Sequence, residues 1–208
     1  MRVSPALVLV AVVAIAAPAA AHPMSALARI GASQIVAPIE AGASIAFTVP
    51  LAMTSVPLLD SRADVEVACG ISEESTPPTS QLLAQGMRGD ASAGSMRTAR
   101  VVAATKVDVS VLDPTVAAAR NLPRSVPGLD TSGAGKMSEL RYFDYTGGPV
   151  KVSVSPPRNF NARTWACAVF INERGRPIDV VTYNRALPGG LHFLDDASLK
   201  GYDSGFFS

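Results

Sequence analysis

The chain contains only two histidines, His22 and His192, and their positions point to metal chemistry. His22 directly follows a run of alanines, so cleavage of a leader after Ala21 would make it the first residue of the mature protein. A terminal histidine carries a free α-amine and an imidazole on one residue, and copper(II) favours such nitrogen ligands in a square-planar arrangement. A second imidazole and a nearby carboxylate would complete the site, and the candidates are His192 and Asp195.

The mature terminus His22-Pro23 resembles that of periplasmic copper-resistance carriers and, more distantly, that of copper-dependent polysaccharide monooxygenases. Both families are β-sandwiches with an N-terminal histidine, and the resemblance covers these two residues and that architecture. It implies a periplasmic copper-binding protein that uses His22 and His192. The alternative is that His22 merely follows the leader and His192 lies in a surface loop, which leaves the protein without a cofactor.

The sequence contains no recognisable catalytic motif, so we do not predict an enzyme. The chain has no Gly-x-Ser-x-Gly elbow, the turn that presents a serine nucleophile, because the segment from Gly201 to Gly205 has the wrong spacing. The carboxylates of Glu73 and Glu74 are adjacent, and neighbours on a strand point to opposite faces. Adjacency therefore gives no shared acid–base site.

The first 21 residues have the composition of a signal peptide. Arg2 is the only charged residue before an apolar run from Ala6 to Ala17, and small residues follow up to Ala21. A cut after Ala19 fits almost as well as one after Ala21. The apolar run is too short to cross a bilayer, and no second hydrophobic span follows it. We therefore predict a signal peptide over residues 1–21 and a single domain over residues 22–208, in the periplasm or outside the cell.

The charge of the chain excludes nucleic acid as a partner. There are 18 basic and 17 acidic residues, and loss of the leader removes one arginine, so the mature chain is formally neutral. The basic residues are scattered singly, whereas binding of a phosphate backbone needs them gathered on one surface.

Cys69 and Cys167 are the only cysteines, so only one disulfide is possible within the chain. An exported protein matures in an oxidising compartment, where such a pair forms a structural bridge. Neither cysteine belongs to a Cys-x-x-Cys motif, which argues against a redox pair or a thiolate metal site. Closing this loop would remove about 4–5 kcal/mol of unfolded-chain entropy.

Apolar and polar residues alternate along many segments, which is typical of half-buried strands. Strands are expected over residues 45–49, 64–72, 106–111, 150–154, 165–171 and 178–183. The segment 165–171 is apolar at every position, so it is predicted to be a central strand that is covered on both faces.

Glycine and proline mark the connections between these strands. Hairpin turns are expected at 146–149, which contains a Gly-Gly pair, and at 172–176. Short helices are expected after Asp113-Pro114 and over 195–200, and long loops over 72–96 and 122–137.

These elements predict an all-β fold, an antiparallel β-sandwich of about seven strands with long loops and one disulfide. The position of Trp165, two residues before the second cysteine, is similar to the aromatic residue of immunoglobulin-like domains, although those domains also bury a tryptophan between their cysteines. By elimination, the sequence favours a secreted, non-enzymatic protein with a binding or assembly role. Its partner would be an unknown protein or surface ligand, or a second copy of the chain.

Overall fold

The structure is a computed structural model, which describes residues 27–36, 42–89, 100–125, 136–187 and 200–207. Antiparallel strands dominate the described residues, and three short helices interrupt them. The strands are β1 (Leu27–Ile30), β2 (Gln34–Val36), β3 (Ile45–Val49), β4 (Leu51–Asp60), β5 (Ala63–Ser72), β6 (Arg100–Val107), β7 (Ser110–Val111), β8 (Lys136–Tyr145), β9 (Val150–Val154), β10 (Thr164–Glu173), β11 (Arg176–Asp179) and β12 (Tyr202–Phe206). The helices are α1 (Ser80–Met87), α2 (Pro114–Ala119) and α3 (Val180–Ala186).

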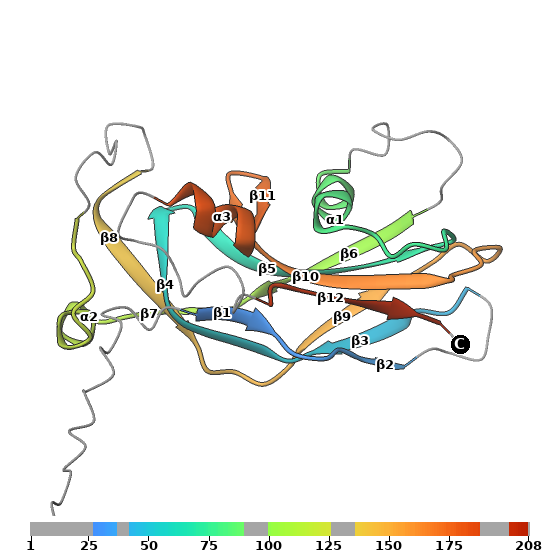
Figure 1. Cartoon of the computed structure of the whole chain (residues 1–208), viewed down its shortest axis with the longest axis horizontal. Coiled ribbons are helices and arrows are strands. Elements are labelled where there is room, and N and C mark those ends of the chain that lie inside the picture. Colours follow the sequence, from blue (N-terminus) through green and yellow to red (C-terminus); the bar gives the residue numbers. More distant parts are fainter. Residues whose placement is uncertain (1–26, 37–41, 90–99, 126–135, 188–199, 208) are drawn as a thin grey trace, which may run out of the picture.

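The strands form three sheets. The first has the order β11-β10-β5-β6, and β12 also pairs with β10. The second has the order β1-β4-β8-β7, and the third has the order β2-β3-β9. Only Pro50 separates β3 from β4, so the second and third sheets follow one another along the chain. Figure 1 shows β3 and β9 on one side of β5 and β10, and α1 and α3 on the other.

The central sheet is buried on both faces. On β5, Val65 and Val67 are fully buried in a core that also contains Phe47 of β3 and Val152 of β9. On the opposite face, Phe170 of β10 and three alanines of β5 and β10 pack against α1. The prediction of a central strand that is covered on both sides is therefore confirmed, and its cause is the unbroken apolar run of β10.

The predicted disulfide joins Cys69 and Cys167, which lie directly opposite each other on β5 and β10. Their Cα atoms are 4.1 Å apart, close to the spacing of a directly opposed antiparallel pair. The bridge lies within one sheet, whereas the disulfide of immunoglobulin domains joins two sheets. The mostly β fold with antiparallel sheets and one disulfide is confirmed.

Two of the expected strands have other boundaries in the structure. The segment 106–111 is not one strand, because β6 ends at Val107 and the short β7 begins at Ser110 in a different sheet. The segment 178–183 is a strand only up to Asp179, whose side chain accepts a hydrogen bond from the Thr182 backbone N–H and so caps α3. In both cases local alternation of apolar residues continues past the point where the chain turns away.

One of the two expected hairpins is wrong. The segment 146–149 connects β8 to β9, but β8 pairs with β4 and β7, and β9 pairs with β3. The second hairpin is confirmed, because β10 and β11 pair directly and Arg174 and Gly175 have φ angles of 53° and 78°. Two successive positive φ angles match the right-handed twist of the strands that they join.

The helix after Asp113-Pro114 is confirmed as α2, and the expected loop 72–96 contains the unpredicted helix α1. More strands form than the seven expected, since β4 was not predicted and several short strands pair at sheet edges. The signal peptide over residues 1–21 lies outside the described residues, as does the helix predicted over 195–200 except for its last residue.

Candidate functional site

The three predicted copper ligands, His22, His192 and Asp195, all lie outside the described residues. Within the part of the chain that the structure describes, no group of three or more histidine, cysteine, aspartate or glutamate residues could hold a metal ion. The copper site therefore stays a prediction from the sequence.

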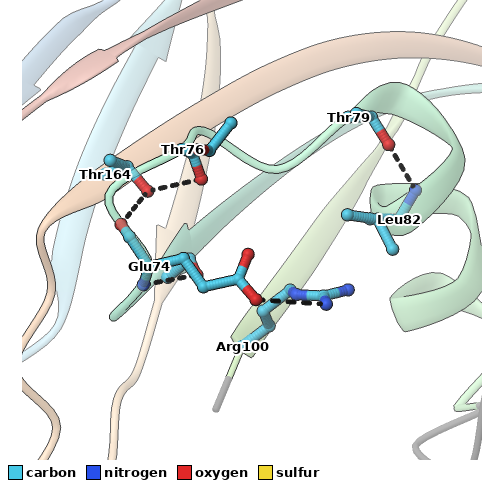
Figure 2. Close-up of polar contacts among 7 residues, drawn as sticks. Glu74, Thr76, Thr79, Leu82, Arg100 and Thr164 are labelled. Carbon is cyan, nitrogen blue, oxygen red and sulfur yellow. Dashed lines mark hydrogen bonds and ion pairs between the residues drawn. The ribbon is translucent and has the colours of Figure 1, made fainter. Parts of the chain in front are cut away.

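The adjacent carboxylates Glu73 and Glu74 have separate partners. Glu73 Oε1 accepts a hydrogen bond from the Asn161 backbone N–H at 2.8 Å, whereas Glu74 Oε1 lies 3.8 Å from an Arg100 guanidinium nitrogen. Figure 2 shows Thr164 beside Glu74, and the Thr164 hydroxyl donates toward the carbonyl oxygens of Glu74 and Thr76 at 3.0 and 3.3 Å. These contacts fix the segment between β5 and α1, so this cluster positions a helix and has no acid–base pair.

A cavity lies between α2 and β8, and we call it the α2–β8 groove. Its volume is about 580 Å³. The described residues that line it are Val111, Leu112, Pro114, Ala117, Leu122, Pro123, Arg124, Glu139, Leu140, Arg141 and Tyr142. Most of these side chains are aliphatic or proline, and the charged ones are exposed to solvent.

Backbone hydrogen bonds at the edge of β8 hold the two walls of the groove. The Leu112 N–H donates to the Tyr142 carbonyl at 2.8 Å, at the point where β7 ends. The Leu140 N–H donates to the Arg124 carbonyl at 2.9 Å, so the chain that leaves α2 returns to the same strand edge. Between these contacts the buried side chain of Leu122 packs into the core. The edge of β8 is therefore bounded at two points, and the groove lies beside it.

The side chain of Tyr142 also holds the segment that follows α2. Its hydroxyl donates a hydrogen bond to the Pro123 carbonyl at 2.7 Å. The ring is 2% exposed, and this burial raises the pKa of Tyr142 to about 12. The phenol is thus neutral over the physiological range and keeps its proton for this hydrogen bond.

A charged cluster fixes α2 on its other side. Arg120, the C-cap of α2, donates from both terminal nitrogens to the Asp144 carboxylate, at 3.1 and 3.0 Å. Arg120 also donates to the Ser55 hydroxyl at 2.8 Å, and the Ser55 backbone N–H donates to Asp144 at 2.7 Å. Ser55 is buried with a φ angle of 52°, at a register shift between β4 and β8. This irregularity in β4 turns the Ser55 N–H toward the carboxylate, and the cluster ties α2 to two strands.

The described lining of the groove has a limited set of polar side chains. Its eleven described residues include no histidine, cysteine, serine, threonine or lysine. The polar groups among the described lining residues are two arginines, one glutamate and a neutral phenol. A pocket of this size that combines aliphatic side chains with polar groups can hold a small ligand.

The sequence interpretation missed this groove because residues 122–137 were assigned to a polar loop. Leu122 and Pro123, at the start of that segment, are the only signal that it returns to the core. An apolar residue just after a short capped helix is a weak indication, since many loops contain one.

A comparison with known proteins found no matching family model, no matching curated protein and no matching solved structure. Among the helices of the described residues, none has the length and apolar character needed to cross a membrane.

Proposed function

We propose that this chain is a non-enzymatic binding protein that acts outside the cytoplasm and holds its ligand or partner in the α2–β8 groove. The observation that carries the proposal is the groove itself, which is lined by both aliphatic and polar side chains and has a volume of about 580 Å³. Small-molecule sites have volumes of roughly 300–1,000 Å³ and are lined mostly by apolar side chains with a few polar groups.

The fixed position of the walls supports this assignment. A preformed site loses less conformational entropy on binding than one that must be assembled. Here Tyr142 holds the Pro123 carbonyl, and Arg120 is bound to Asp144 by two hydrogen bonds. Both contacts lie next to the groove and leave its apolar surface open.

Solvent-exposed apolar residues next to the groove also support it. Val111 on β7 is 53% exposed and Val116 on α2 is 39% exposed, and both belong to the few large apolar side chains that the described residues leave open to solvent. Exposed apolar surface beside a pocket is typical of interaction sites.

We also propose that the fold is a β-sandwich and that the chain is exported, as the sequence predicts. The face-to-face packing of β5 and β10 against β3 and β9 supports classification as a β-sandwich. The disulfide supports export to an oxidising compartment after removal of residues 1–21.

Binding of a neutral apolar fluorophore tests this proposal. We would titrate N-phenyl-1-naphthylamine into the wild-type protein and into Ala117→Phe, which places a ring inside the groove. Ala118→Phe is the matched control, because Ala118 is exposed on the same helix and does not line the groove. The proposal expects saturable binding that falls at least about tenfold in Ala117→Phe and is unchanged in Ala118→Phe. Equal binding by all three folded proteins would contradict it.

A further inference from the structure

We infer that the ligand of the α2–β8 groove is a small amphiphile, with an apolar chain and a carboxylate or similar anionic group. This inference rests on the proposed function and specifies its ligand. The apolar part follows from the lining, and the anionic part follows from the charged residues at the rim.

Among the described residues, the rim carries more positive than negative charge. Arg124 and Arg141 both line the groove, and Glu139 is the one acidic residue among its described lining residues. All three side chains are exposed to solvent, so they can reach a group at the mouth of the groove. An anionic group at the rim is attracted by the two arginines and repelled by Glu139. A cationic group is repelled by the two arginines and attracted by Glu139.

The two arginines lie beside the same part of the apolar floor. Arg141 follows Leu140 directly on β8, and the Arg124 carbonyl accepts the hydrogen bond of the Leu140 N–H. The backbones of Arg124 and Arg141 thus lie next to Leu140 on two separate segments, and both residues line the groove. An apolar chain that lies in the groove would bring its polar end to the part of the rim that these two segments form.

Neither guanidinium forms an ion pair with a carboxylate of the described residues. Other basic residues of the same structure do, since Arg120 binds Asp144 and Arg174 binds Asp60. Arginine presents a planar fork of N–H donors that matches a carboxylate with two parallel hydrogen bonds. Toward the described part of the chain, the N–H donors of Arg124 and Arg141 are thus open to an anionic ligand.

A matched pair of ligands tests the charge requirement. We would measure the affinities of dodecanoate and dodecanol, below micelle-forming concentrations, by displacement of the neutral fluorophore. We expect dodecanoate to bind about tenfold more tightly at low ionic strength, with the difference shrinking as salt is added. Arg124→Gln and Arg141→Gln should each weaken dodecanoate binding by about threefold to tenfold and leave dodecanol unchanged. Arg163→Gln, an exposed arginine that does not line the groove, is the control.

The outcomes separate this inference from the proposed function. Equal affinities for the acid and the alcohol, with normal binding of the fluorophore, would overturn the anionic ligand and leave the groove as a binding site. Equal losses in all three arginine variants would also overturn it, because the effect would then be one of overall charge. Failure of the fluorophore itself to bind would instead contradict the proposed function.

Discussion

The bond between Arg120 and Asp144 should contribute measurably to stability, unlike most ion pairs on the protein surface. The Asp144 side chain is 15% exposed and the Arg120 side chain is 34% exposed, and two N–H groups of the guanidinium reach the carboxylate. Exposed pairs contribute about 0.2–1 kcal/mol, whereas hydrogen bonds to charged groups contribute about 1.5–3 kcal/mol. For this half-buried pair with two hydrogen bonds, we expect a coupling free energy of about 1–2 kcal/mol.

A double-mutant cycle measures this coupling. Urea unfolding of the wild type, Arg120→Met, Asp144→Asn and the double variant gives the four free energies that the cycle needs. Asparagine retains an oxygen that can accept the Ser55 backbone N–H, so the cycle reports the charge pairing and not the loss of that acceptor. The Arg120→Met variant should also bind the neutral fluorophore more weakly, because Arg120 holds the end of α2.

A second ion pair of the same protein is the control. Lys106 and Asp64 are 2.8 Å apart, as close as the first pair, but their side chains are 65% and 44% exposed. Solvent screens this pair, so its cycle should give a clearly smaller coupling. A coupling free energy for Lys106–Asp64 equal to or larger than that for Arg120–Asp144 would contradict this prediction, since burial and geometry would then not decide the strength of these ion pairs.

Three further predictions concern other parts of the chain. Burial raises the pKa of Tyr142 from its ordinary value of 10 to about 12, so the unfolded chain loses this proton at lower pH than the folded protein. The free energy of unfolding should therefore not depend on this group below pH 10 and should fall between pH 10 and 12, by up to about 1.4 kcal/mol per pH unit. Urea unfolding of Tyr142→Phe should show a shallower fall over the same pH range. Replacement of both Cys69 and Cys167 by alanine should lower the free energy of unfolding by about 4–5 kcal/mol, because the bridge closes a loop with a sequence separation of 98; a loss below about 1 kcal/mol in denaturant unfolding would contradict this. If the copper prediction is right, the native intact mass of the protein secreted by its own leader should begin at His22 and retain one copper ion, which His192→Ala should lose; a chain that starts elsewhere or ignores copper would end that hypothesis.

The regular parts of the fold could be predicted from the sequence because their local pattern agrees with their tertiary surroundings. Val65 and Val67 alternate with residues of the opposite face, and the structure buries both in the core. The apolar run around Cys167 indicated a strand that is covered on both faces, and α1 provides the second cover. Only one disulfide was possible, so its pairing followed once export was assumed.

Features that depend on distant partners could not be predicted. The Gly147-Gly148 turn looks like a hairpin, but the partner of β9 is β3, about one hundred residues earlier in the chain. The strand β4 contains a proline, Pro57, and its backbone is irregular at Ser55, which has a positive φ angle. A proline argues against a regular strand, and the irregularity at Ser55 interrupts the alternation of buried and exposed side chains. The groove could not be predicted for the same reason. Its walls come from α2 and from β8, which lie on either side of a segment that the sequence assigned to a loop.

The position of a bound apolar ligand would show whether the α2–β8 groove is the binding site. We would record the amide resonances of the ¹⁵N-labelled protein during titration with N-phenyl-1-naphthylamine and map the residues whose signals shift. We expect the largest shifts on the amides of Leu112, Ala117 and Leu140, and we expect Ala117→Phe to abolish them. Saturable shifts confined to the exposed strand β12, around Phe206, would contradict the assignment of the α2–β8 groove as the binding site.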